Sequence, residues 1–400
     1  MRILFLYDFP LWGSGSGTYL RHLIYEMVKL GHRVGLVCPD ERRFMEDKIK
    51  QYRVQAPQIP VFIGHPELRG AKRYSELSER EITEIYKAYL DTTLEAVENF
   101  KPDFLHVQHL SLITWVARYI KAIKGVRYFI TSHGSCLHDI LQDKRYLPLT
   151  SDAAKNAKAI TFVSSDSRSK FIKIFGRDYS KNLFVIPGGV RIKDFPLQLD
   201  TAKTDTEYNL QGKKVVLFTG RLISNKGVEY LVKAAKEIQG EVLLVGDGPK
   251  KHQLEQLIAQ QNIKNVRLLG YKSGQDLINL YYRADVFVAP SVWEEPLGLT
   301  ILEAMAAQKP VIATRKGGIP SLLKNGHNGY FVKPRNAKEI ADTCNKLLQN
   351  DELRKKMGEH ARLSIEKRFD WKIITLKFDK LYKRYFNGKP KHNGNHNGKK

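Results

Sequence analysis

Cysteine and long apolar runs are scarce in this chain of 400 residues, and each shortage excludes a class of protein. The three cysteines, Cys38, Cys136 and Cys344, lie far apart, which argues against a disulfide framework or a zinc site and fits a reducing cytosol. No run of eighteen apolar residues occurs, so we expect no membrane-spanning helix. The apolar start, MRILFLYDF, is too short for a signal peptide and predicts a first strand.

Acidic residues are also in short supply. The chain has 66 Lys and Arg against 42 Asp and Glu, a formal charge of +24, and the basic excess gathers after Arg354. Such a surface attracts the phosphates of nucleic acids, anionic lipids or charged substrates, and it is equally typical of a solubilising face. Aromatic residues are not interleaved with Lys and Arg as base-stacking platforms. A nucleic-acid-binding protein is therefore an alternative, and our main hypothesis includes no nucleic-acid partner.

Strand and helix patterns alternate along nearly the whole chain, which predicts parallel sheets covered on both faces. We expect an α/β protein with two Rossmann-like, doubly wound domains, at residues 1–190 and 210–370, and a cleft between them. The segment 191–209, rich in proline and polar residues, is the expected linker. The amphipathic segment 371–386 predicts a closing helix packed on the N-terminal domain, and an interfacial membrane helix is the alternative. Residues 387–400 are predicted to form a disordered basic tail.

The expected strands are short apolar runs bounded by turn or polar residues. They are Arg2–Tyr7, Arg33–Cys38, Phe104–Val107, Arg127–Thr131, Ala159–Val163 and Leu183–Ile186 in the first half, and 213–220, 241–246, 266–270, 284–290 and 310–314 in the second. The expected helices are Thr18–Leu30, Glu76–Phe100, Val228–Ile238, Gln253–Gln261 and 299–306.

The most specific segment is WEEPLGLTILEAMA, residues 293–306, which follows an expected strand. It places Glu295 and Glu303 eight residues apart across a Pro-Leu-Gly turn that opens into a helix. A helix start leaves backbone N–H groups without partners and carries partial positive charge, so it suits a phosphate or a set of sugar hydroxyls. Ligands of open α/β sheets bind at such strand ends.

A second loop, GRLISNKG at 220–227, follows the expected strand at 213–220 and carries two cations. Arg221 offers a planar fork for phosphate oxygens, and Lys226 offers a mobile point charge. Together they could hold a diphosphate without a metal ion, whereas a surface arginine and lysine are the alternative interpretation. GDGP, at 246–249, predicts a tight turn that lets the backbone pass close to a ligand.

The first loop, WGSGSGT at 12–18, joins the first expected strand to the first helix. Small residues such as Gly13 and Ser14 let backbone N–H groups approach an anion. The spacing is G-x-G-x-G rather than the G-x-G-x-x-G of dinucleotide-binding proteins, so a nicotinamide enzyme has little support.

His133 ends the expected strand at 127–131 and precedes Gly134. A histidine over the cleft could hydrogen-bond a sugar hydroxyl or stabilise developing charge, although a lone histidine is more often structural. The residues alone leave both interpretations open.

These motifs, in this order over almost the whole chain, resemble those of the retaining glycosyltransferases of family 4, which have the two-domain GT-B architecture. The resemblance implies that Glu295 lies near the donor sugar and that Glu303 takes the ribose hydroxyls of the nucleotide. It implies that Arg221 and Lys226 neutralise the leaving diphosphate and that His133 contacts the transferred sugar. The remaining donor-binding positions that it implies are backbone groups at Gly13, Ser14, Leu297, Gly298, Leu299 and Thr300.

Two departures from the family pattern are visible. The family often has paired glycines in the first loop, where this chain has Gly13-Ser14-Gly15, and often has Asn-Gly-Val-Asp after the last strand of the first domain, where this chain has Gly188-Gly189-Val190-Arg191. The chain also lacks the Asp-x-Asp pair with which metal-dependent sugar transferases hold a divalent ion. The resemblance therefore implies no metal and no cofactor beyond the nucleotide-sugar donor.

The expected function is the transfer of a hexosyl-type sugar from a UDP- or GDP-linked donor to an acceptor hydroxyl, with net retention. The basic surface favours a lipid-linked or anionic acceptor and a cytoplasmic enzyme at the anionic inner face of the cell membrane. The expected acceptor is a glycan, a lipid-linked sugar or a small molecule. An inactive scaffold of the same fold is a further alternative, which the presence of Glu295, Glu303, Arg221 and Lys226 disfavours.

Overall fold

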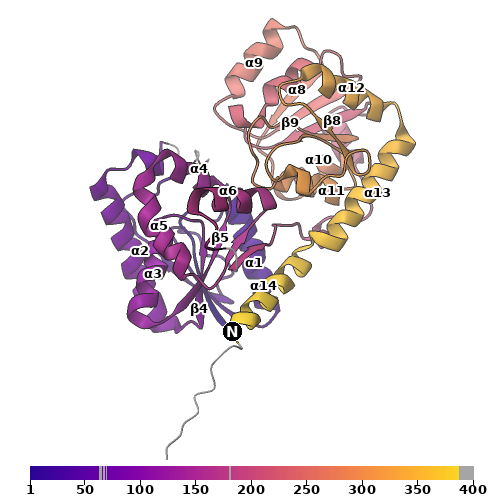
Figure 1. Cartoon of the computed structure of the whole chain (residues 1–400). Coiled ribbons are helices and arrows are strands. Elements are labelled where there is room, and N and C mark those ends of the chain that lie inside the picture. The colour runs from indigo at the N-terminus through magenta and orange to yellow at the C-terminus, as the bar shows by residue number, and fades with distance from the viewer. Residues whose placement is uncertain (63–64, 66–67, 69, 180–181, 387–400) are drawn as a thin grey trace, which may run out of the picture.

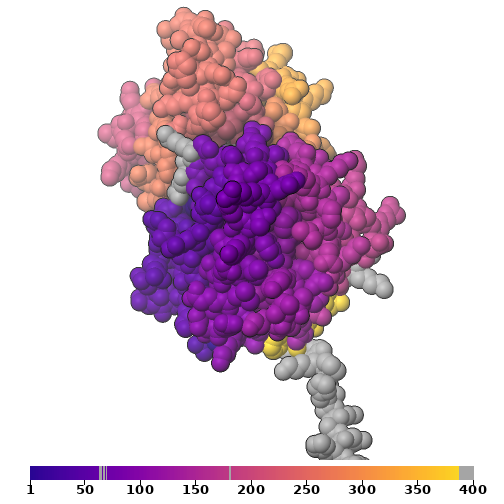
Figure 2. Space-filling view, turned by 90° about the vertical axis from the view of Figure 1, so that its left-hand side faces the viewer, coloured from indigo at the N-terminus to yellow at the C-terminus, as the bar shows by residue number. Residues whose placement is uncertain are grey.

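Two α/β domains make up the described part of the chain, which is residues 1–62, 65, 68, 70–179 and 182–386 of a computed structural model. Each domain has one parallel sheet with helices on both faces, which confirms the expected pair of doubly wound domains (Figure 1). The space-filling view separates an indigo-to-magenta N-terminal lobe from a salmon and orange C-terminal lobe (Figure 2). The predicted tail at 387–400 lies outside the described residues.

The N-terminal sheet has seven parallel strands in the order β3-β2-β1-β4-β5-β6-β7. The strands are β1 (Arg2–Leu6), β2 (Arg33–Cys38), β3 (Ile49–Arg53), β4 (Phe104–Gln108), β5 (Arg127–Ser132), β6 (Ile160–Phe162) and β7 (Leu183–Val185). The strand order reverses between β1 and β4, so the connections that leave these strands pass to opposite faces of the sheet. A crevice opens at such a point, outside the carboxyl ends of the two strands.

The C-terminal sheet has six parallel strands in the order β10-β9-β8-β11-β12-β13. The strands are β8 (Val215–Thr219), β9 (Glu241–Val245), β10 (Val266–Gly270), β11 (Val286–Ala289), β12 (Val311–Thr314) and β13 (Gly329–Val332). Here the order reverses between β8 and β11. The loops that carry GRLISNKG and WEEPLGL therefore leave the sheet side by side, at its own crevice.

Helices cover both faces of each sheet, and some of them begin at capping side chains. Ser14 caps α1 by accepting a hydrogen bond from the N–H of Gly17, and Ser78 and Glu81 form a capping box at α2. The N-terminal helices are α1 (Gly15–Lys29), η1 (Tyr74–Glu76), α2 (Glu79–Phe100), α3 (Leu112–Lys124), α4 (Ser135–Gln142), η2 (Lys144–Tyr146), α5 (Leu147–Asn156) and α6 (Ser165–Phe175). The C-terminal helices are η5 (Ser224–Lys226), α8 (Val228–Ala234), α9 (Lys251–Gln260), α10 (Gly274–Arg283), α11 (Leu299–Ala306), η6 (Ile319–Ser321), α12 (Ala337–Leu348) and α13 (Asp351–Arg368).

The chain crosses between the domains twice, and the two crossings are hydrogen-bonded to each other. Val190 donates its N–H to the carbonyl of Phe369 at 3.0 Å, and its own carbonyl accepts from the N–H of Trp371 at 3.1 Å. Only a glycine fits before this pair, because a Cβ atom on Gly189 would lie 2.1 Å from the Phe369 oxygen. This close approach gives a physical reason for the Gly-Gly sequence at the crossing.

The last described helix, α14 (Trp371–Phe386), lies along α1 in the N-terminal domain (Figure 1). Its apolar stripe is buried: Trp371, Ile374, Phe378 and Tyr382 are 0% exposed. The expected return of the C-terminal helix to the N-terminal domain is thereby confirmed. The apolar stripe packs against the N-terminal domain, and the lysines of α14 lie on the opposite, exposed face.

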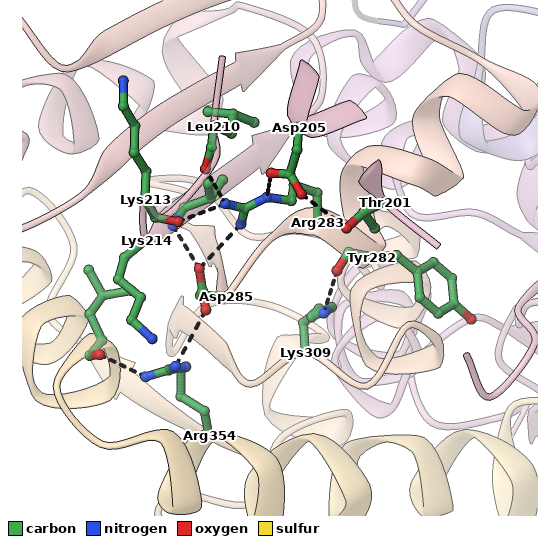
Figure 3. Close-up of polar contacts among 12 residues, drawn as sticks. Thr201, Asp205, Leu210, Lys213, Lys214, Tyr282, Arg283, Asp285, Lys309 and Arg354 are labelled. Atoms are coloured by element: carbon green, nitrogen blue, oxygen red, sulfur yellow. Dashed lines mark hydrogen bonds and ion pairs between the residues drawn. The ribbon is translucent and has the colours of Figure 1, made fainter. Parts of the chain in front are cut away.

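The segment between the domains is partly helical, with η4 (Ile192–Asp194) and α7 (Ala202–Glu207), and an ionic network fixes it to the C-terminal domain (Figure 3). Arg283 is paired with Asp205 of α7 and donates to the carbonyls of Leu210 and Lys213, both at 2.7 Å. Asp285 accepts from the N–H of Val215 at 2.8 Å. This network surrounds the amino ends of β8 and β11, the sheet edge opposite the crevice.

Candidate active site

A cavity of about 330 Å³ lies between the carboxyl ends of the two sheets. Both crevices contribute to it, because its walls come from the loops after β1, β4, β5, β8 and β11. Of the sequence-predicted site residues, the structure brings together Gly13, Ser14, His133, Arg221, Lys226, Glu295, Leu297, Gly298, Leu299 and Thr300 around this cavity. Glu303 alone among the predicted residues does not line it.

Arg221, Lys226 and Glu295 form the charged part of the wall. Lys226 ends η5, and its Nζ lies 2.7 Å from Oε1 of Glu295, which follows β11. Glu295 is buried and also accepts a hydrogen bond from the hydroxyl of Ser291 at 2.6 Å. Burial lowers the pKa of Arg221, and the nearby Glu295 opposes that change. Two cations held beside a buried carboxylate can bind an anionic group and steady a neighbouring polar one.

The start of α11 supplies the uncharged part of the same wall. Residues 297–300 line the cavity just where the helix begins, so the unpaired N–H groups of the helix start belong to the same cavity as the two cations. The aligned peptide dipoles add partial positive charge at this end. The arrangement therefore suits a phosphate or diphosphate.

GDGP does not line the cavity, and its glycines serve the loop beneath it instead. A Cβ atom on Gly246 would lie 1.9 Å from the oxygen of Gly220, so the turn packs directly against the Arg221 loop. Leu222 donates its N–H to the carbonyl of Asp247 at 2.8 Å. The sequence predicts that GDGP lies close to a ligand. Among the described contacts, it lies close to the backbone of the Arg221 loop.

The first loop of the N-terminal domain closes the cavity from the other side. Ser14 and Ser16 lie 3.2 Å and 2.9 Å from the hydroxyl of Tyr7, which fixes the loop over the end of β1. A Cβ atom on Gly15 would lie 3.5 Å from Leu299, so this loop and the start of α11 face each other closely. Gly13 and Ser14 thus lie opposite the charged wall.

His133 lies at the end of β5, where its Nε2 and the Oε1 of Gln108 are 2.9 Å apart. The edge of its ring meets Tyr19, with centroids 4.8 Å apart. Burial lowers its pKa to about 3, so the imidazole is neutral at ordinary pH. A neutral imidazole held by an amide can hydrogen-bond a hydroxyl group.

Glu303 lies one turn into α11, where its carboxylate accepts a hydrogen bond from the hydroxyl of Tyr281 at 2.7 Å. Burial raises its pKa to about 7, and the hydrogen bond from Tyr281 opposes the rise. The carboxylate is therefore beside the cavity wall rather than in it.

The sequence interpretation missed an aromatic wall on the N-terminal side of the cavity. Phe9, Phe62 and His109 have ring centroids 5.1–5.2 Å from one another, and Val61 lies beside them. Phe9 and His109 follow β1 and β4, so the strand-end reasoning that selected His133 could have found them. Phe62 lies in an irregular segment that has no local signal.

Comparison with known proteins assigns the family. The model "Glycosyl transferase 4-like domain" matches residues 14–189, and "Glycosyl transferases group 1" matches residues 200–364. An uncharacterised glycosyltransferase of Methanocaldococcus jannaschii is 32% identical over 290 residues, which are 72% of this chain and 76% of that protein. The chain belongs to the GT4-like glycosyltransferases.

This glycosyltransferase is also 26% identical over 383 residues to N-acetyl-alpha-D-glucosaminyl L-malate synthase of Bacillus anthracis, which covers 92% of this chain and 93% of that protein. Sucrose-phosphate synthase from Thermosynechococcus elongatus superposes with a TM-score of 0.79 at 23% identity, over 97% of this chain and 100% of that one. Anabaena HepE, solved in complex with UDP and glucose, superposes with a TM-score of 0.76 at 21% identity, over 96% of this chain and 100% of that one. These likenesses confirm the GT-B fold.

In the described part of the glycosyltransferase, no helix has the length and apolarity to cross a membrane. The same residues contain no group of three or more His, Cys, Asp or Glu side chains placed to hold a metal ion. The three cysteines are buried and unpaired.

Proposed function

We propose that this glycosyltransferase moves a hexosyl-type sugar from a UDP- or GDP-linked donor to an acceptor hydroxyl, with net retention and without a metal ion. The observation that carries the proposal is the shared wall of Arg221, Lys226 and the start of α11 in one interdomain cavity. Two cations and a helix N-terminus are a suitable site for a diphosphate. That HepE, a protein of the same fold, was solved with UDP and glucose supports a nucleotide-sugar donor.

The reaction separates charge, and the cavity wall stabilises it. As the bond between the anomeric carbon and the diphosphate oxygen breaks, positive charge grows on the sugar ring and negative charge on the leaving diphosphate. Arg221, Lys226 and the N–H groups of α11 face the negative charge, and Glu295 supports the positive charge or holds a hydroxyl of the sugar. Lys226 is already held by Glu295 at 2.7 Å, so it needs little reorganisation to serve both groups.

The remaining roles follow from position. His133 binds the transferred sugar, and Gly13 and Ser14 close over the diphosphate from the N-terminal domain. Glu303 accepts the ribose hydroxyls of the nucleotide, which requires its carboxylate to turn from Tyr281 or to share its free oxygen. The acceptor enters from the N-terminal side of the cavity. It attacks the sugar on the face that the diphosphate leaves, because no carboxylate besides Glu295 lines the described part of the cavity and could act as a nucleophile.

The acceptor that we propose is a lipid-linked sugar or another glycan precursor, used by a cytoplasmic enzyme at the inner face of the cell membrane. The support is the basic outer face of α14, where Lys372, Lys377, Lys380, Lys383 and Arg384 are exposed. Because the apolar stripe of α14 is buried, membrane contact would be electrostatic and sensitive to salt. Flotation with phosphatidylglycerol vesicles at 50 mM and 500 mM salt tests this, and absence from the low-salt vesicle fraction would contradict it.

A thermal-shift panel of nucleoside diphosphates and their sugars tests the donor assignment. A ligand at 100 times its Kd stabilises the folded protein by about 2.7 kcal/mol, which is roughly 5–10 °C for domains of this size. We expect such a shift with UDP or GDP compounds and a much smaller shift with NAD. The absence of a shift with every nucleotide sugar would refute the proposal.

A further inference from the structure

His109 follows β4 at the carboxyl edge of the N-terminal sheet, and its imidazole lines the cavity beside His133. The side chain is 1% exposed, and the centroids of the two histidine rings are 4.6 Å apart. The backbone N–H of His109 donates to the carbonyl of Thr131 at 2.8 Å, so β5 holds the residue where β4 ends. Its φ angle is +80°, in the left-handed region that non-glycine residues rarely adopt.

Both ring nitrogens of His109 are buried and have no hydrogen-bond partner among the residues that the structure describes. His106, on the same strand, is the contrasting case: its Nε2 lies 2.8 Å from the hydroxyl of Thr131, and its Nδ1 lies 2.6 Å from the hydroxyl of Tyr382. Buried polar groups are almost always paired, and an unpaired one needs an explanation. A ligand in the cavity would supply the missing partner of His109.

The surroundings of His109 narrow the chemistry of that ligand. The rings of Phe9 and His109 pack edge to face, with centroids 5.1 Å apart. The ring of Phe62 stacks on that of Tyr74, with centroids 4.7 Å apart. An aromatic wall packs well against the C–H face of a sugar ring or a cyclic polyol. The neighbouring imidazole then offers one donor and one acceptor to a hydroxyl group of that ring.

The described residues of the N-terminal domain that line the cavity include no Asp, Glu, Lys or Arg. Arg221, Lys226 and Glu295 all belong to the C-terminal domain. Burial, reinforced by the nearby His133, holds the pKa of His109 well below its usual range, so its imidazole is neutral. A neutral imidazole in an aromatic wall does not compensate a carboxylate or a phosphate, whose transfer into such a site is costly.

We propose that His109 binds the acceptor by hydrogen-bonding its reactive hydroxyl, and that the group which enters between Phe9, Phe62 and His109 is an uncharged sugar ring or cyclic polyol. This inference rests on the proposed glycosyl transfer and adds to it the chemical class of the acceptor group. Any anionic part of the acceptor then lies outside the cavity.

Two substitutions at His109 suit its backbone. His109→Gly accepts the positive φ angle and removes the ring, and His109→Asn tolerates that angle while keeping a donor and an acceptor. We expect His109→Gly to raise the KM for methyl α-D-glucoside or myo-inositol by about 10-fold, the effect of one lost hydrogen bond. His109→Asn should give an acceptor KM between those of His109→Gly and the wild type.

His106→Leu is the matched control, because it removes a buried imidazole whose partners are all within the protein. We expect it to lower Tm while leaving the acceptor KM unchanged, whereas His109→Gly should lower Tm through lost packing and also raise the acceptor KM. Equal acceptor KM in His109→Gly and the wild type would overturn the inference. Preferential transfer to glycerol 3-phosphate or L-malate over both uncharged probes, or transfer to neither uncharged probe, would also overturn it.

Saturation-transfer NMR separates failure of this inference from failure of the proposed function. If the wild-type protein neither binds nor hydrolyses any nucleotide sugar, the proposed function fails. Binding of methyl α-D-glucoside or myo-inositol can still be compared between the wild type and His109→Gly. Loss of the signal in His109→Gly supports the assignment of His109, and an unchanged signal, or no signal from the wild type, contradicts it.

Discussion

Lys226→Ala tests the diphosphate assignment directly. Two unit charges about 4 Å apart interact by about 4 kcal/mol at an effective dielectric constant of 20. The Lys226 side chain is 27% exposed, so solvent weakens this, and we take about 3 kcal/mol for its effect on the leaving diphosphate. Transfer measured as nucleoside diphosphate release at saturating acceptor should therefore fall about 100-fold.

The folded state should tolerate this substitution. Glu295 loses its partner at 2.7 Å but keeps the hydrogen bond from Ser291 at 2.6 Å. We expect the loss to be about 1 kcal/mol, which lowers Tm by about 2–4 °C. A fall in activity with this small change in Tm separates a catalytic effect from misfolding.

Lys316→Ala is the matched control for Lys226→Ala. Lys316 pairs with Glu294 at 2.9 Å, is 32% exposed and lies close in space, but it does not line the cavity. Its loss should change transfer less than about 2-fold. If Lys226→Ala transfers sugar at the wild-type rate, or if Lys316→Ala loses as much activity, the reasoning about fixed cations is wrong.

Four further predictions address Glu303, the segment between the domains and the reaction itself. Because burial raises the pKa of Glu303 to about 7, its carboxylate becomes protonated as the pH falls through that value. The donor KM should therefore rise toward acid pH in the wild type and not in Glu303→Gln. Arg283→Ala removes a side chain, 11% exposed, that pairs with Asp205 and Asp285. The free energy of unfolding should fall by about 3 kcal/mol, which lowers Tm by roughly 6–12 °C, while the nucleotide Kd measured by calorimetry stays unchanged. EDTA should leave the rate unchanged, and the product should keep the anomeric configuration of the donor in its ¹H NMR spectrum; a strong loss with EDTA or an inverted product would contradict the mechanism.

Local pattern predicted most of the framework. The strand Arg33–Cys38 and the helix at 299–306 have the expected bounds, because an apolar run or a helix-forming run is bounded there by clear turn residues. The helix expected from Glu76 begins at Glu79 instead, since Ser78 and Glu81 cap it. The strand Ile49–Arg53 was missed because it is a half-exposed edge strand whose sequence, IKQYR, has no apolar run. The helix α7 was missed because Arg283, far along the chain, holds it.

The site residues also fall into those that local motifs predict and those that depend on the tertiary fold. Arg221, Lys226 and Glu295 lie in motifs that can be recognised in a few consecutive residues, and the structure places all three on one cavity. The aromatic wall depends on β1 and β4 lying next to each other, about a hundred residues apart in sequence. Strand-end position could have singled out His109, but no local pattern reports that Phe62 lies beside it, so the wall as a whole is visible only in three dimensions.

The paired crossings at Val190 and Asp370 bear on how motion of this enzyme can be measured. Since both polypeptide connections run through one short ladder, we expect the lobes to tilt about this ladder more easily than they slide past each other. The first strand and the end of α14 both belong to the N-terminal lobe (Figure 1). Fluorophores attached at Met1 and Phe386 would therefore travel together and report no opening, whereas one dye on α9 and one on α2 would register it.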